Sequence, residues 1–304
     1  YRNFLNKLWN ANNFLITNEC DLTHIDKIPT LSVNINKWIY AELIEAKTKI
    51  EKNLEDYRFD EAAKNTYQFA WHSYCDWYLE LSKTILFSDN EVAKAEVKKV
   101  STYVFKQILI LLHPFIPFVT EKIWLKNKFD KSSKKFLMLA NWPSGKINKD
   151  SNTKQVENII NIISELRSFK NELHISPGSF IDISINNIND DQKKFIKTNE
   201  IILKKLGRIN NILSDDTNKP AATMIVAGNF LKIYFDKDVD LKLIKENLIN
   251  KQNRLTKEMN KISQRLKNKS FVNRAPKEIV EQEKINYNNL MNDIDKILVT
   301  IKGI

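Results

Sequence analysis

The sequence predicts a mainly α-helical protein with three parts: a helical bundle, a small α/β module and an antiparallel coiled-coil hairpin at the C-terminus. In residues 1–150, apolar side chains recur three and four positions apart, which is typical of helices that bury one face. In residues 151–237, this period gives way to short runs in which apolar and polar residues alternate, as they do in strands. In residues 238–304, apolar residues recur every seven positions, the period of a coiled coil. These three ranges are the expected domains.

Five helices joined by short loops are expected in the first part. Pro114 disfavours helix in the residue before it, so the fourth helix should end at His113. Residues 137–142 are expected to be extended, and residues 142–145 to form a turn. The other boundaries are read from prolines and capping residues: the second helix follows Pro29, the third has Asp60 as its N-cap, the fourth starts near Asn90 and the fifth follows Pro117.

The third helix lies in a run without proline or glycine, from Arg58 to Asn90. Its stretch Phe69–Lys83 is apolar on nearly all sides, and a helix of that kind is covered by other helices. We therefore expect this stretch to be the central strut of the bundle. Asp76 and Glu80 lie four apart on one face, where a salt bridge or hydrogen bond is expected rather than acid–base chemistry.

The second part begins with a sixth helix from Lys154. Strands are then expected at residues 180–185, 209–213, 222–226 and 230–235, with a helix at 191–206 and a hairpin turn at 227–229. A module of about 60 residues has a small core, so it should pack on a neighbouring part. In the third part, two heptad helices are joined by a short turn, and Pro276 fits the first turn of the second helix.

The charge of the chain is concentrated near its C-terminus. The net charge of +11 favours an acidic partner such as nucleic acid, and residues 241–304 hold 14 basic against 7 acidic residues. The outer faces of coiled coils are normally charged, but with the two signs interspersed. From Lys251 to Arg274 there are eight basic residues and one acidic residue, which favours a surface that binds RNA phosphates. The candidates on this arm are Arg254, Lys257, Lys261, Arg265, Lys269 and Arg274.

Several classes of protein are disfavoured by what the sequence lacks. It has no apolar run of membrane-spanning length, no secretory signal and no glycine-rich phosphate loop. Its two cysteines form no disulfide framework, which fits a reducing, cytoplasmic location, and Cys75 is expected in the core. The four histidines have no metal-ligand spacing, so no metal site is expected. We find no catalytic constellation and expect no cofactor to bind this segment.

Four stretches of the chain have distinctive sequences. They are Asn6–Ala11 (Asn-Lys-Leu-Trp-Asn-Ala), Trp71–Lys83 with Cys-Asp-Trp-Tyr-Leu-Glu, Leu111–Trp124 with His-Pro-Phe-Ile-Pro-Phe, and Arg265–Pro276 with Phe-Val-Asn-Arg-Ala-Pro. Together they resemble the C-terminal portion of the valyl-tRNA synthetase family, a class I aminoacyl-tRNA synthetase family. The resemblance covers essentially the whole chain. It implies an anticodon-binding helical domain followed by a coiled-coil arm that binds tRNA.

Two alternatives stay open. The first is the same region of an isoleucyl or other sibling synthetase, because the His-Pro-Phe block is shared with those enzymes. The ending disfavours it: many bacterial isoleucyl enzymes end in a cysteine-ligated zinc module, whereas this chain has no cysteine after Cys75. The second alternative is a coiled-coil scaffold for protein partners, which predicts self-association through the heptads and no affinity for RNA.

The resemblance also implies a division of labour. A full-length enzyme of this family would join valine to tRNA-Val through valyl-adenylate, using ATP and Mg²⁺, and would edit mischarged threonine. Both synthetase signature motifs are missing from these residues, so the segment itself is expected to hold no catalytic residues. The resemblance implies that it binds tRNA-Val, contacts its own N-terminal catalytic domain and acts as part of a monomer. RNA is read specifically where its bases are unstacked, so the bundle should hold the anticodon loop. The candidates there are Arg2, Lys7, Asn10, Phe14 and Arg58.

Overall fold

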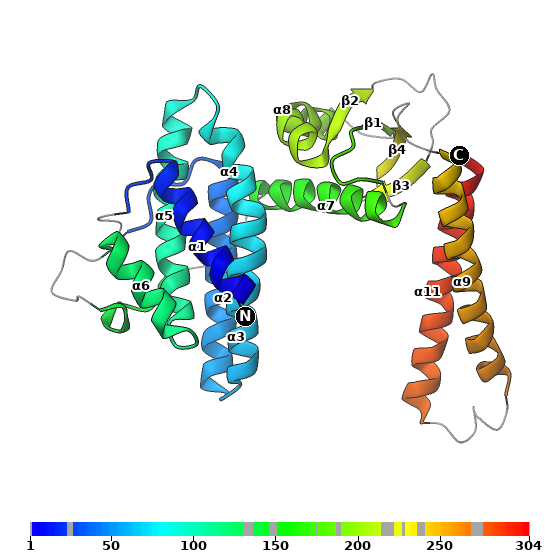
Figure 1. Ribbon diagram of the computed structural model, residues 1–304, viewed down its shortest axis with the longest axis horizontal. Helices are drawn as coiled ribbons and strands as arrows, with labels where there is room; N and C mark the ends of the chain where they lie inside the picture. The colour runs from blue at the N-terminus through cyan, green and yellow to red at the C-terminus, as the bar shows by residue number, and fades with distance from the viewer. Residues whose placement is uncertain are drawn as a thin grey trace. The chain divides into compact units, whose positions relative to one another are not determined.

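The computed structural model describes residues 2–22, 27–129, 136–145, 151–173, 175–186, 190–213, 222–226, 229–235, 241–268 and 276–303. The chain divides into two compact units, Tyr1–Ile160 and Asn161–Ile304, and each is described by itself (Figure 1). The boundary between the units falls inside α7 (Ser151–Glu172). The division into three domains stays a prediction.

The first unit is a bundle of helices around α5 (Figure 1). Every side chain from Val100 to Leu112 on α5 is buried, as expected of a helix that other elements surround. α5 contacts α1, α2, α3, α4 and α6, and the mainly α-helical prediction is confirmed. The elements before α7 are α1 (Arg2–Thr17), α2 (Asn34–Glu55), α3 (Phe59–Gln68), η1 (Phe69–Tyr78), α4 (Leu79–Leu86), α5 (Glu91–Leu112), α6 (Pro117–Asn127) and η2 (Leu137–Leu139).

The stretch expected to be the central strut contains a π-helix. η1 joins α3 to α4 without a break and contacts both α1 and α2. Its backbone bonds span five residues rather than four, which widens the helix locally. The Tyr74 hydroxyl donates to the Ser101 carbonyl oxygen (2.9 Å), and the Tyr78 hydroxyl donates to Asn36 Oδ1 (2.7 Å). Both tyrosines are fully buried, so these hydrogen bonds avoid the free-energy cost of an unpaired buried hydroxyl.

Aromatic rings connect η1 to α6 through the core. The centroid of the Tyr74 ring lies 5.7 Å from that of the Tyr78 ring and 6.0 Å from that of the Phe105 ring. Phe129 lies 6.4 Å from Phe105 and 5.5 Å from Trp124. Ring pairs at such distances each add about 0.5–1.5 kcal/mol beyond the area they bury. The π-helix is therefore fixed to α5 and to the end of α6 by ring packing.

One expected capping residue and one expected extended segment are wrong. Asp60 is not the N-cap of α3: the helix begins at Phe59, and Arg58 precedes it without a capping side chain. Asp60 lies in the first turn instead, where its negative charge interacts favourably with the helix dipole. Leu137–Leu139 form a short 3-10 turn rather than an extended segment, and the Leu137 N–H donates to the Glu121 carboxylate at 3.1 Å.

The start of α5 and the start of α6 agree with the sequence. The Asn90 side chain accepts a hydrogen bond from the backbone N–H of Ala93 at 3.0 Å, which is the geometry of an N-cap. Pro117 is the first residue of α6, where its missing N–H has no helical partner to lose. α5 itself ends at Leu112, one residue before the expected end at His113.

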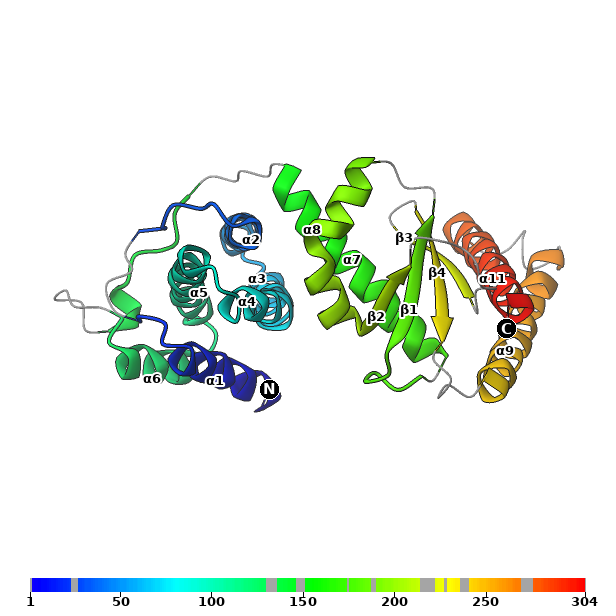
Figure 2. The same ribbon diagram turned by 90° about the horizontal axis from the view of Figure 1, so that it is seen from above.

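The second unit contains a four-stranded sheet with the strand order β2-β1-β4-β3. β1 and β2 are parallel and are connected through α8, whereas β4 pairs antiparallel with β1 and β3. α7 and α8 lie on the same side of this sheet (Figure 2). The four expected strands are confirmed, and residues 227 and 228 of the expected hairpin turn lie outside the described residues. The elements are β1 (Ile181–Asn186), α8 (Asp190–Gly207), β2 (Ile209–Leu213), β3 (Ala222–Val226) and β4 (Asn229–Phe235).

Two long helices complete the second unit. α9 (Leu241–Lys267) and α11 (Lys277–Gly303) lie side by side and run in opposite directions, because only nine residues connect them (Figure 1). Leu248 and Ile297 share a buried cluster with Leu173 and Ile175, and α11 also contacts β3. The α/β module thus packs on a neighbour, as its size predicted, whereas the coiled-coil geometry stays a prediction. Among the helices in the described ranges, none is both long and apolar enough to cross a membrane.

Candidate nucleic-acid interface

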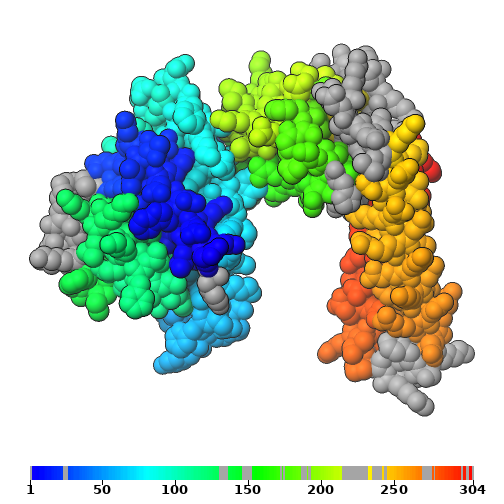
Figure 3. Space-filling view, viewed as in Figure 1, coloured from blue at the N-terminus to red at the C-terminus, as the bar shows by residue number. Residues whose placement is uncertain are grey.

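The arm formed by α9 and α11 presents a row of cations on α9. Arg254, Lys257, Lys261 and Arg265 are all exposed, as the sequence predicted. Their spacing of three and four residues places them along one side of the helix, while Ile262 is buried in the seam. Figure 3 shows side chains of α9 at the surface of the second unit. A row of fixed positive charge is what phosphates on a nucleic-acid backbone require.

The six arm candidates are not equally placed. Lys269 and Arg274 lie outside the described residues. Arg265 Nη1 lies 2.6 Å from Glu283 Oε1 of α11, and this ion pair neutralises part of its charge. Arg254, Lys257 and Lys261 are therefore the best placed cations for an RNA partner.

The candidates on α1 differ in how free they are to contact a partner. α1 lies at the surface of the first unit (Figure 3), and Arg2 and Asn10 are exposed. Lys7 is half-buried: its Nζ lies 2.5 Å from Asp76 Oδ1 and 5.2 Å from the centroid of the Trp71 ring. Lys7 therefore fastens α1 to η1, which the sequence did not predict because Asp76 is 69 residues away. The expected ion pair of Asp76 is present.

Phe14 lies where α1 meets α4. Its ring is half-buried, and Lys83 Nζ lies 5.8 Å from the ring centroid. Lys83 also pairs with Glu80 at 2.6 Å, which confirms the ion pair expected for that carboxylate. Phe14 is therefore partly a packing residue and partly accessible.

Arg58 lies on the connection between α2 and α3 and has two aromatic neighbours that our sequence reasoning missed. Its guanidinium is 3.7 Å from the Glu61 carboxylate. Tyr57 is 81% exposed and Phe59 is 56% exposed, and their rings meet edge to face with centroids 6.3 Å apart. Tyr57 also has a φ of 57°, which L-residues rarely adopt. The triplet Tyr-Arg-Phe between two helices was the signal available in the sequence.

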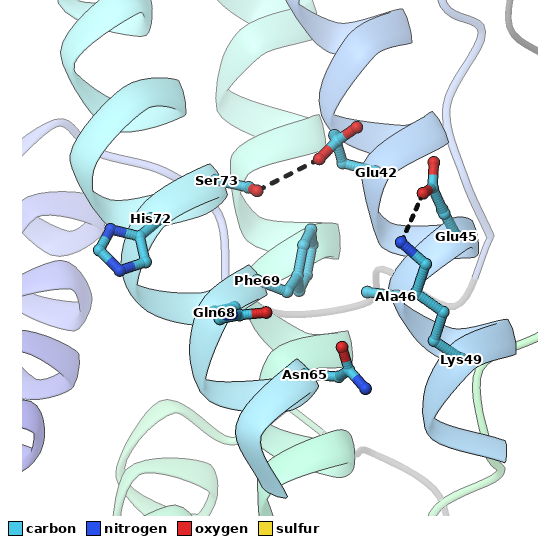
Figure 4. Close-up of a pocket in the computed structure, with 9 residues that line it drawn as sticks. All are labelled: Glu42, Glu45, Ala46, Lys49, Asn65, Gln68, Phe69, His72 and Ser73. Carbon is cyan, nitrogen blue, oxygen red and sulfur yellow. Dashed lines mark hydrogen bonds and ion pairs between the residues drawn. The ribbon is translucent and has the colours of Figure 1, made fainter. Parts of the chain in front are cut away.

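A shallow hollow of about 280 Å³ lies between α2 and the α3–η1 helix (Figure 4). Ser73 donates to Glu42 at 3.3 Å, and Lys49 pairs with Glu45 at 2.7 Å. The remaining polar groups on its walls are amides and a histidine: Asn65, Gln68 and His72. These groups can donate and accept hydrogen bonds, but the two carboxylates oppose the approach of a phosphate.

Cys75 is a buried thiol of η1. Burial raises the pKa of the Cys75 thiol to about 12, and the Lys7 ammonium lowers it by less, so this thiol is a core group. In the part of the chain that the structure describes, no group of three His, Cys, Asp or Glu residues is placed to hold a metal ion.

Comparison with known proteins gives two matching family models. Residues 36–185 match the anticodon-binding domain of tRNA ligase, and residues 240–304 match the valyl tRNA synthetase tRNA binding arm. The first range runs from α2 to β1, and the second contains α9 with its cations and α11.

Proteins named valine–tRNA ligase are similar to the chain over nearly all of its length. The one from Pelagibacter ubique (strain HTCC1062) is 71% identical over 304 residues, which are 100% of this chain and 35% of the relative. The one from Francisella tularensis subsp. tularensis is 34% identical over 292 residues, 94% of this chain and 32% of the relative. The one from Brucella suis biovar 1 is 31% identical over 286 residues, 93% of this chain and 31% of the relative.

The chain thus spans about a third of the length of these relatives. Most of the bundle lies in the range that matches the anticodon-binding domain, and the arm, which follows it in the sequence, lies in the range that matches the tRNA binding arm. The chain therefore belongs to the valyl-tRNA synthetase family and corresponds to its anticodon-binding and tRNA-binding region.

Proposed function

We propose that this chain binds tRNA-Val through two surfaces, the helical bundle and the cation row of α9, as part of a valine–tRNA ligase. The observation that carries the proposal is the row of exposed Arg254, Lys257 and Lys261 inside the segment that matches a tRNA-binding arm. Phosphate contacts position an RNA and need little more than fixed positive charge. The unequal distribution of charge along the chain supports the same conclusion.

The bundle is proposed to contact the anticodon loop. Exposed Arg2 and Asn10 on α1 can reach phosphates and base edges, while Arg58 and its two aromatic neighbours offer planes for stacking. Unpaired bases are read by such stacking and by hydrogen bonds to their edges. A change of anticodon in tRNA-Val should then weaken binding by about 1–3 kcal/mol. Equal affinity for tRNA-Val with its own anticodon and for tRNA-Val with the changed one would limit the bundle to contacts with the RNA backbone.

The remaining activity would belong to other parts of a full-length enzyme. A catalytic domain would join valine to tRNA-Val with ATP and Mg²⁺, and an editing site would remove mischarged threonine. The residues of this chain bind and orient the tRNA, and they supply no group to the chemistry. We expect the enzyme to act as a monomer in the cytoplasm, with the bundle packed on its own catalytic domain.

The salt dependence of tRNA affinity tests the arm. The variant in which Arg254, Lys257 and Lys261 are all replaced by Gln should bind more weakly. The slope of log affinity against log salt should become shallower by about 3, one for each lost phosphate contact. Fluorescence anisotropy of labelled tRNA-Val at several salt concentrations measures both quantities.

A matched control removes the same charge elsewhere. Lys193, Lys194 and Lys197 are exposed on α8, and their replacement by Gln should change the slope much less. Equal slopes for the two triple variants would contradict a specific role for the arm. Absence of tRNA binding by the unmodified chain, together with self-association in sedimentation, would support the scaffold alternative instead.

A further inference from the structure

The end of α8 places an arginine in a strained backbone conformation. Arg208 has a φ of 53°, the left-handed region in which glycine usually follows a helix. Gly207 precedes it but is needed for another reason, since a Cβ there would lie 2.9 Å from Cδ1 of Ile209. The strain therefore falls on the arginine. Strained residues persist only where the surroundings hold them, and they are common at functional sites.

The side chain of Arg208 lies on an exposed aromatic ring. Its guanidinium carbon is 5.6 Å from the centroid of the Phe180 ring, and 45% of Phe180 is exposed. Arg208 is also exposed, and within the described ranges no carboxylate forms an ion pair with it. A flat cation and an aromatic ring therefore form one exposed surface, which we call the Arg208–Phe180 platform.

Buried hydrogen bonds hold the backbone on both sides of this platform. The Lys170 ammonium donates to the carbonyl oxygens of Ser179 (2.8 Å), Gly207 (3.1 Å) and Arg208 (3.4 Å). The Ile181 N–H donates to the same Arg208 oxygen at 3.1 Å. These hydrogen bonds thus connect Arg208 to Ser179 and Ile181, the residues on either side of Phe180. The platform is fixed before any partner arrives, which reduces the entropy lost on binding.

Positive charge is concentrated around the platform. Arg167 donates through Nη2 to the carbonyl oxygen of Leu206 at 3.2 Å, which brings a second guanidinium to the end of α8. Burial, and then the charges of Arg208 and Arg167, lower the pKa of Lys170 to about 8. Three cations therefore repel one another here, and an anion that approaches Arg208 would relieve that repulsion.

We propose that the Arg208–Phe180 platform is a third contact for tRNA, at which an unpaired base stacks and a neighbouring phosphate meets the arginine. The proposal rests on the proposed tRNA-binding function and extends it to the α/β module, where neither family model covers Arg208. Arginine planes and aromatic rings are the surfaces on which RNA bases stack. An acidic peptide would use the charge but not the ring, so the ring favours RNA.

Substitutions in the 304-residue chain separate stacking from folding. Arg208→Gly removes the guanidinium and relieves the strain at φ 53°, so its melting temperature should be equal or higher. Its affinity for tRNA-Val should nevertheless fall about five- to tenfold, a loss of the size expected for one stacked base. Phe180→Leu should reduce the affinity for tRNA-Val by a similar factor and leave the salt dependence of that affinity unchanged. The double variant should lose little more than either single one, because both residues form one platform.

Two controls make the result specific. Lys197→Gln removes one exposed charge on α8, the helix that precedes Arg208, and should change affinity less than twofold. Arg208→Lys keeps the charge without the plane, so it should keep the salt slope and lose most of the affinity that Arg208→Gly loses. Polyglutamate, tested as a second ligand, should bind the unmodified chain and Phe180→Leu equally.

The outcomes distinguish this inference from the function on which it rests. If the unmodified chain fails to bind tRNA-Val, the proposed function itself is wrong. If the chain binds with a steep salt dependence, but Arg208→Gly and Phe180→Leu bind as well as it does, only the platform proposal is overturned. An equal loss for tRNA and polyglutamate in Phe180→Leu would overturn the assignment to RNA.

Discussion

Glu96 of α5 holds the start of α2, and this contact leads to a quantitative prediction. Its carboxylate accepts the backbone N–H groups of Ser32 (2.9 Å) and Val33 (3.0 Å), the Ser32 hydroxyl, and the side-chain amide of Asn36 (2.9 Å). The N–H groups at the start of a helix have no partner within the helix. Glu96 therefore caps α2 from a different helix.

The cost of losing Glu96 can be estimated from these contacts. Loss of a capping side chain costs about 1 kcal/mol. Asn36 is fully buried, so its amide N–H would be left unpaired, at a cost of about 1–3 kcal/mol. We expect Glu96→Ala to lower the free energy of unfolding of the first unit by about 3 kcal/mol, and Glu96→Gln by about 1 kcal/mol, because the amide keeps one acceptor.

The pH dependence follows from the pKa of Glu96. Partial burial raises the pKa of this carboxyl, but hydrogen bonds from Asn36, Ser32 and Val33 outweigh that effect and hold it below its ordinary value of 4.5. A folded-state pKa below the unfolded one gives a stabilisation that is complete above pH 4.5 and is lost as the pH falls through the lowered pKa. Glu96→Gln should remove this part of the acid sensitivity.

The distribution of tryptophan makes the assay selective. All six tryptophans lie between residues 9 and 142, so their fluorescence during urea unfolding reports on the first unit. Unfolding curves at pH 7 and at pH 4 give the free energy of unfolding and its loss on acidification. A stability of Glu96→Ala within about 0.5 kcal/mol of the unmodified chain would refute the capping role. An unchanged acid dependence in Glu96→Gln would refute the electrostatic part.

Three further results are expected. Burial raises the pKa of Cys20 to about 11 and that of Cys75 to about 12. Neither thiol should therefore react with a disulfide reagent at pH 8 until urea unfolds the chain, and rapid labelling of the native chain would contradict this. For the same reason, the free energy of unfolding should fall as the pH rises above 9. Gly145→Ala should destabilise the first unit by about 1–3 kcal/mol in the same unfolding assay, because φ is 154° and the new Cβ would lie 2.5 Å from the Tyr40 hydroxyl oxygen. Glu283→Gln should change stability by less than about 1 kcal/mol, measured by circular dichroism, since its arginine partner is exposed; a larger loss would show that the ion pair holds the arm together.

The fold class and most elements could be predicted because they depend on local periodicity. Helix ends were harder to predict where the usual glycine is missing. Glu19, Tyr57 and Lys128 adopt the left-handed conformation after α1, α2 and α6, and these three helix ends carry no glycine signal. Arg208 adopts the same conformation directly after Gly207, the last residue of α8. The π-helix was also missed, because the same apolar spacing fits an ordinary α-helix over ten residues.

Candidate binding residues could be predicted only where exposure follows from the helix pattern. The α9 cations are exposed because the apolar seam of the heptads occupies another side of that helix. Lys7 is drawn into the bundle by Asp76, and Glu96 caps a helix that begins 62 residues earlier. Contacts between residues so far apart in the sequence depend on packing, which periodicity does not describe.

The stretch that identifies the family and the surface proposed to bind RNA obey different physical requirements. Buried Tyr74 and Tyr78 each need one partner at hydrogen-bond distance, and few other side chains would fit those positions. Such residues make a distinctive motif while facing the core. Phosphate contacts need charge at roughly the right place, so Lys257 or Lys261 could be replaced by arginine with little loss. An excess of charge on one surface is therefore a better guide to the RNA contact in this chain than the motif by which the chain is recognised.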